Sequence, residues 1–136
     1  ATPHPLNLAR AIAACPDHIV WVGGLAEVWA PPLYAVGARG FTSGLINVWP
    51  ERSMEIHAAL DAGDYPKANR LIDEMRVFED IRAEEQNGTN VTGVKAALMA
   101  IGQDCGPTRP PSAWPLTDRQ QAALDGFVKA NGLAGV

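Results

Sequence analysis

Residues 37–50, GARGFTSGLINVWP, decide the fold. Within them, residues 39–43 (RGFTS) predict a short buried strand, the next glycine a turn, and Pro50 the first position of a helix. Upstream, residues 18–22 (HIVWV) are mostly apolar and β-branched, and two glycines separate them from a helical run. Two successive units of strand, glycine and helix are typical of parallel strands whose carboxyl-terminal loops carry function.

The first of these strands shows no alternation of apolar and polar residues. Strands of this kind belong to parallel sheets with helices on both faces, so we expect residues 18–22 to be covered on both sides.

The composition is typical of one soluble globular domain, with 136 residues, 47% hydrophobic and 19% charged. A net charge of −4 and scattered basic residues argue against a nucleic-acid partner. The sequence shows neither a secretory leader nor an apolar run near the roughly 20 residues of a membrane helix, so we expect no membrane partner. Cys15 and Cys105 lack motif spacing, which favours a reducing, cytoplasmic location.

Helical spacing of apolar residues predicts the remaining elements. Pro31 and Pro32 lie inside the run after the first strand, so that helix is expected to begin properly only near Ala30. Asp64 predicts the cap of a long amphipathic helix, and residues 105–115 are expected to be irregular because they hold four prolines. The predicted helices cover residues 6–15, 25–36, 50–62, 65–86, 91–101 and 118–131.

Two parallel strands do not make a stable sheet alone, because both edges stay open. Either the helices carry the fold, or the chain is part of a larger α/β body. The opening of the sequence favours the larger body, because a helix follows at once with no strand before it. We therefore expect a further strand just upstream of Ala1.

Five motifs in this order resemble the carboxyl-terminal half of the dihydrodipicolinate synthase / N-acetylneuraminate lyase family. They are GLAE at residues 24–27, GARGFTS at 37–43, Asn47 with Pro50, AGD at 62–64 and NVTGVK at 90–95. The resemblance implies an α/β fold, with residues 1–63 as the carboxyl-terminal part of a (β/α)8 TIM barrel. Residues 18–22 and 39–43 would be strands seven and eight, and residues 64–136 a helical C-terminal extension.

The resemblance also implies Schiff-base chemistry that needs no cofactor. The family's nucleophilic lysine ends strand six, which places it just before Ala1, with the proton-relaying tyrosine further upstream. We therefore expect no catalytic residue within this chain. Three lysines are present, and the family keeps one at the position of Lys95 without using it as the nucleophile. The three histidines lack metal-ligand spacing, so no metal site is expected.

The residues expected to bind substrate follow the two predicted strands. Glycine lets a backbone approach a ligand or simply makes a tight turn, and family position favours ligand contact. The resemblance implies that the backbone carbonyl of Thr42 faces the Schiff base, and Ser43 either contacts substrate or caps the turn. The five expected substrate-binding residues are Gly23, Gly24, Leu25, Thr42 and Ser43.

Two more residues are candidates with competing interpretations. Glu27 is either an acid–base or hydroxyl-binding group, or a solvated carboxylate that interacts with a helix dipole, and we favour the solvated carboxylate. Asn47 is expected to hold its loop rather than to touch substrate.

The resemblance predicts a lyase that acts on a 2-oxo acid. GLAEVWAP and GFTSGLIN look closer to sugar-acid dehydratases than to dihydrodipicolinate synthase, so we expect dehydration of a 2-keto-3-deoxy sugar acid such as 2-keto-3-deoxyarabonate. The alternative is a pyruvate-dependent aldolase or synthase. The expected partners are the amino-terminal half of the barrel and three further copies in a homotetramer. A chain that truly began at Ala1 would instead be a non-catalytic helical interaction module.

Overall fold

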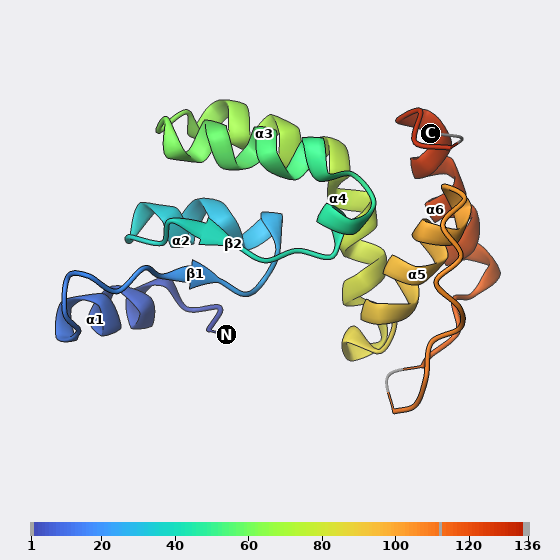
Figure 1. Ribbon diagram of the computed structural model, residues 1–136, viewed down its shortest axis with the longest axis horizontal. Coiled ribbons are helices and arrows are strands. Elements are labelled where there is room, and N and C mark those ends of the chain that lie inside the picture. The colour runs from blue at the N-terminus through green and yellow to red at the C-terminus, as the bar shows by residue number, and fades with distance from the viewer. Residues whose placement is uncertain (1, 112, 135–136) are drawn as a thin grey trace. The chain divides into compact units, whose positions relative to one another are not determined.

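The computed structural model describes residues 2–111 and 113–134 (Figure 1). The described residues form an α/β structure with six α-helices, two short 3-10 helices and two strands. The chain divides into two compact units. The first contains the chain up to Ser43 together with Glu51–Asp73, and the second contains Gly44–Pro50 together with the chain from Glu74 onward. The domains predicted at 1–63 and 64–136 remain a prediction.

A parallel strand pair organises the first unit. Strand β1 (Val22–Gly23) pairs with β2 (Gly40–Phe41), in the register Val22↔Gly40 and Gly23↔Phe41 (Figure 1). Backbone bonds extend the ladder on both sides: Arg39 N–H donates to the Trp21 carbonyl, and Thr42 N–H donates to the Gly23 carbonyl, each over 2.8 Å. The two predicted parallel strands are therefore confirmed, although both are shorter than expected.

The crossover between the strands is helical, as parallel pairing requires. It consists of the 3-10 helix η1 (Glu27–Trp29) and helix α2 (Ala30–Ala35), so the predicted start of the helix proper at Ala30 is confirmed. Leu33 and Tyr34 of α2 are buried, and the Tyr34 ring lies 6.4 Å from the ring of Phe41 in β2. Helix α1 (Pro5–Ala14) begins on a proline and contacts α2.

Helix α3 (Pro50–Asp61) also begins on the predicted proline. Its buried side chains include Ile56 and Leu60, and the Tyr34 hydroxyl hydrogen-bonds Nδ1 of His57 over 2.8 Å. Gly63 ends the helix with φ +75°, a conformation that glycine adopts without steric cost. Asp64 then caps helix α4 (Tyr65–Asn87), because its Oδ1 accepts the Lys67 N–H.

The second unit is built on three helices. It contains the later turns of α4, then α5 (Asn90–Ala100) and α6 (Asp118–Ala130), with the 3-10 helix η2 (Leu45–Asn47) beside α5. Aromatic rings fill its interior: Phe127 of α6 lies 5.9 Å from Phe78 and 6.1 Å from Trp49. The expected helices of this region are confirmed.

One prediction about local structure is wrong, and another stays a prediction. The long helix leaves helical geometry at Glu84, before the predicted end, and Glu85 and Gln86 have positive φ. The expected covering of residues 18–22 on both faces stays a prediction for a larger α/β body, since within this chain Val20 is 71% exposed and Val22 56%. Within the described residues the sheet has only these two strands, so both of its edges lack a neighbouring strand.

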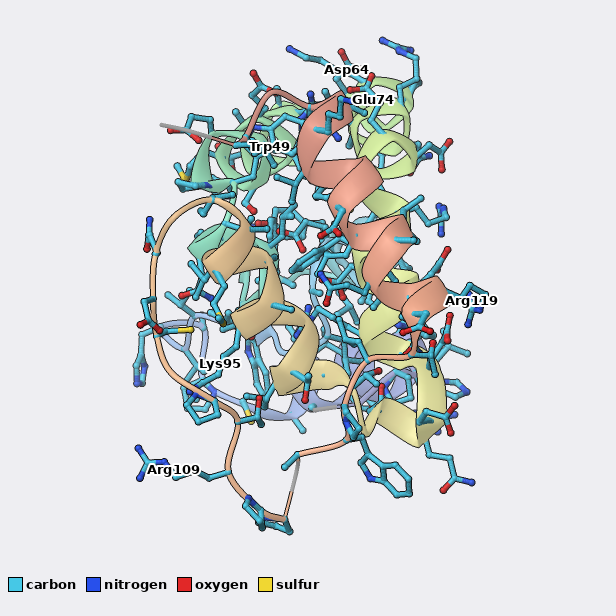
Figure 2. All side chains as sticks on the ribbon, turned by 90° about the vertical axis from the view of Figure 1, so that its right-hand side faces the viewer. Trp49, Asp64, Glu74, Lys95, Arg109 and Arg119 are labelled. Atoms are coloured by element: carbon cyan, nitrogen blue, oxygen red, sulfur yellow. The ribbon has the colours of Figure 1, made fainter. Side chains whose placement is uncertain are left out.

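The break in α4 is stabilised from α6. The Glu84 carboxylate accepts hydrogen bonds from Arg119 over 2.5 Å and from Gln120 over 2.6 Å. Gln120 also completes a capping box with Thr117, so one glutamine connects the break to the start of α6 (Figure 2 shows Arg119 in the first turn of this helix). These hydrogen bonds, that of Arg119 first, lower the pKa of Glu84 below its ordinary value of 4.5.

We predict that Glu84→Gln removes part of the acid sensitivity of the fold. A carboxyl whose pKa is lowered by folding stabilises the folded state above its unfolded pKa, and this stabilisation disappears as the pH falls through the folded pKa. The variant should be less stable than the wild type at neutral pH, and the difference should shrink in acid. Urea unfolding at several pH values measures this. The exposed neighbour Glu85→Gln is the control, and an equal response of both variants would contradict the assignment.

Candidate functional site

The loops after β1 and β2 meet at one edge of the sheet. Ala26 N–H donates to the Thr42 carbonyl over 3.1 Å, just beyond the strand bond between Thr42 N–H and the Gly23 carbonyl. Parallel strands bring their carboxyl ends to the same edge, which is where barrel enzymes place their reacting groups. The structure therefore brings the five expected substrate-binding residues together in the first unit.

These five residues differ in their solvent exposure. Gly24 and Thr42 are exposed, Leu25 and Ser43 are half-buried, and Gly23 is buried. A Cβ atom at Gly23 would lie 2.8 Å from Cδ1 of Leu33, so close packing of α2 explains this glycine. The substrate contacts predicted for the five residues remain predictions.

Ala26 has an unusual backbone that the sequence does not signal. Its φ of 64° and ψ of −173° lie in a region that is essentially restricted to glycine and that costs roughly 1–3 kcal/mol. Such conformations occur where surrounding contacts determine them, often at functional sites. Two such contacts are present here, the bond to Thr42 and the anchoring of the next residue, Glu27.

Glu27 is buried, so the favoured interpretation of a solvated first-turn carboxylate is wrong. Its side chain has no exposed surface, and its Oε1 accepts a hydrogen bond from the Ser53 hydroxyl of α3 over 2.5 Å. Its Oε2 is buried and has no hydrogen-bond partner among the described residues. The sequence missed Ser53, because a lone serine in a helix carries no pattern. The acid–base interpretation of Glu27 stays a prediction.

Tyr34 is a further buried polar group beside the strands. Burial raises the pKa of its hydroxyl, and the nearby Asp61 carboxylate adds to this effect, while Arg39 opposes it. The hydroxyl therefore stays protonated at neutral pH and holds His57 as a fixed hydrogen-bond partner.

Asn47 lies in the second unit, where its Nδ2 donates to the Gly44 carbonyl over 3.1 Å. Gly44 itself packs against Arg82, since an added Cβ would come within 2.7 Å of both terminal guanidinium nitrogens. Arg82 is buried, pairs with Glu79 and donates to Oδ1 of Asn90 over 2.9 Å. The sequence predicts the buried face of α4 but not this contact with the loop after β2.

The three lysines have different surroundings. Lys67 and Lys129 are exposed. The amine of Lys95 donates to the carbonyls of Cys105 and Pro107 over 3.1 Å each, and Figure 2 shows this side chain beside the irregular segment after α5. Lys95 thus anchors a loop.

A family model places the chain among known proteins. The Dihydrodipicolinate synthetase family matches residues 6–131. The chain belongs to the dihydrodipicolinate synthetase family. The family resemblance predicted from the motifs is confirmed.

Relatives within the dihydrodipicolinate synthetase family include probable 5-dehydro-4-deoxyglucarate dehydratases. That of Acinetobacter baumannii is 35% identical over 108 residues, which cover 78% of this chain and 34% of the relative. That of Xanthomonas campestris is 31% identical over 120 residues, covering 87% and 39%. The chain thus spans little more than a third of the length of these relatives.

Solved structures of the dihydrodipicolinate synthetase family share the fold. Dihydrodipicolinate synthase from Oceanobacillus iheyensis has a TM-score of 0.89 and 34% identity, and the match covers 97% of this chain and 44% of that one. The enzyme from Bacillus clausii has a TM-score of 0.89 and 30% identity, with coverage of 97% and 45%. None of the helices in the described part of the chain has the length and apolar character of a membrane span.

We predict that Gly44→Ala destabilises the second unit by about 1–3 kcal/mol, because the new methyl group displaces the buried Arg82 guanidinium from its partners. Gly126 is the matched control, since it lies in α6 with nothing within 4 Å of an added Cβ. Gly126→Ala should stabilise the helix by roughly 0.5–1 kcal/mol. Urea unfolding of both variants measures the difference, and a neutral Gly44→Ala would contradict the packing role.

Proposed function

We propose that this chain is part of a Schiff-base lyase that dehydrates a 2-keto-3-deoxy sugar acid. The similarity to probable 5-dehydro-4-deoxyglucarate dehydratases is the observation that carries the proposal. Counted from its other carboxylate, 5-dehydro-4-deoxyglucarate is itself a 2-keto-3-deoxy acid. It is therefore the first substrate to test, and 2-keto-3-deoxyarabonate is the second.

The chain supplies the carboxyl-terminal part of a (β/α)8 barrel in this proposal. Strands β1 and β2 are strands seven and eight, residues 1–63 complete the barrel, and residues 64–136 form the helical extension. The exposure of Val20 and Val22 supports a covering by further elements of the intact protein. That amino-terminal half supplies the nucleophilic lysine, and the intact protein is a cytoplasmic homotetramer.

The chemistry uses a lysine amine and neither a metal nor a cofactor. The amine condenses with the C2 ketone, and water leaves as the imine forms. The protonated imine then accepts the electron pair of the C3–H bond when a base removes that proton, which gives an enamine. The enamine expels the C4 hydroxyl group, which leaves as water after protonation. Hydrolysis of the imine releases the dehydrated 2-oxo acid and restores the amine.

This chain contributes groups that bind and orient the substrate. The Thr42 carbonyl is fixed by the Ala26 N–H and faces the imine, where a carbonyl oxygen favours its positive charge. The exposed backbone at Gly24 allows close approach of the 2-oxo acid, and Leu25 and Ser43 complete the contact. Asn47 holds the loop after β2 through Gly44.

A second candidate is a pyruvate-dependent aldolase or synthase. The likeness to the dihydrodipicolinate synthases of Oceanobacillus iheyensis and Bacillus clausii favours it. It uses the same imine, but the enamine attacks an aldehyde and forms a carbon–carbon bond, where a dehydratase expels water.

Steady-state kinetics with the intact protein distinguishes these candidates. We expect turnover of 5-dehydro-4-deoxyglucarate or of 2-keto-3-deoxyarabonate. Mass spectrometry of the product should show the loss of water. Pyruvate with an aldehyde should give no condensation product. Condensation without dehydration would support the aldolase, and inactivity on all of these compounds would contradict both candidates.

A further inference from the structure

A buried pair of side chains connects α3 to the candidate site. Glu27 has no exposed surface and Ser53 is 1% exposed, and the Ser53 hydroxyl donates to Glu27 Oε1 over 2.5 Å. The other carboxylate oxygen is buried without a partner among the described residues. Burying a carboxylate with incomplete hydrogen bonding costs free energy, so stability alone does not explain this pair.

The residue before Glu27 explains what the pair does. Ala26 is held in a conformation that normally requires glycine, with φ 64° and ψ −173°. This conformation directs the Ala26 N–H to the Thr42 carbonyl over 3.1 Å. A strained residue relaxes unless its neighbours are fixed, and Glu27, fixed by Ser53, is its immediate neighbour.

We propose that Ser53 and Glu27 are positioning residues that lock Ala26 in its strained conformation and so aim the carbonyl of Thr42. The catalytic consequence rests on the proposed function, in which that carbonyl faces the imine. Glu27 acts through the loop and does not touch the substrate, because the described structure leaves its carboxylate no exposed surface.

The first experiment separates positioning from proton transfer. Glu27→Gln keeps an oxygen that accepts the Ser53 hydroxyl but cannot act as an acid–base group at neutral pH. We expect it to retain kcat within roughly fivefold, whereas Ser53→Ala should lower kcat by roughly tenfold or more with KM nearly unchanged. An inactive Glu27→Gln beside an unaffected Ser53→Ala would overturn the proposal in favour of a catalytic carboxylate.

A rescue experiment tests the strain directly. Glycine adopts the conformation of Ala26 without a steric cost, so it does not need the Ser53–Glu27 pair to hold it there. We expect Ala26→Gly to raise the kcat of Ser53→Ala by roughly threefold or more, and to change the wild type little. Absence of rescue, with both proteins folded by thermal melting, would overturn the link between the pair and the strain.

Thr92→Val is the matched control. It removes another buried hydroxyl, which has no partner among the described residues and lies in the second unit. It should leave kcat unchanged. If it lowered kcat as much as Ser53→Ala, a general loss of packing would explain both effects and the proposal would fail.

Amide hydrogen exchange reports on the lock without any assay of activity. The Ala26 amide should exchange slowly in the wild type and in Glu27→Gln, and roughly tenfold faster in Ser53→Ala. An unchanged rate in Ser53→Ala overturns the positioning proposal. A wild type that dehydrates none of the tested acids defeats the proposed function instead, and the exchange rates still decide whether the pair fixes the loop.

Discussion

The hydrogen bond from Ala26 to the Thr42 carbonyl is the interaction on which the candidate site depends. It lies where the β1–β2 ladder ends, so it continues the parallel pairing into the two loops. Without it, two strands of two residues each would leave their loops to move independently. The strain at Ala26 shows that surrounding contacts hold this geometry.

Support for the strand pair comes from the helices of the first unit. Helix α2 places Tyr34 against Phe41 of β2 and against His57 of α3, so one side chain connects strand and both helices. The same helix α3 carries Ser53, which anchors Glu27. In the second unit, the Arg82 guanidinium packs against Gly44. Helices α2 and α3 thus hold the strand pair and the loop after β1 within the first unit.

The sequence predicts the elements well and the contacts between them poorly. Caps and prolines predict the helix starts, because Pro50 restricts its own φ and the Asp64 carboxylate accepts a backbone N–H three residues further along. The sequence does not predict the burial of Glu27, because its hydrogen-bond partner Ser53 lies 26 positions away. The strain at Ala26 was invisible, since alanine gives no sign of positive φ. The apolar composition of the first strand indicates that it needs covering, and the described residues leave Val20 and Val22 exposed.

Reductive trapping of the intact protein with borohydride in the presence of 5-dehydro-4-deoxyglucarate, followed by peptide mapping, tests the proposed Schiff base most directly. We predict a single reduced adduct on a lysine outside the 136 residues of this chain, with Lys67, Lys95 and Lys129 unmodified. No adduct on any lysine would contradict the Schiff-base mechanism. An adduct on Lys95 would contradict its role as a loop anchor and place the nucleophile in this chain.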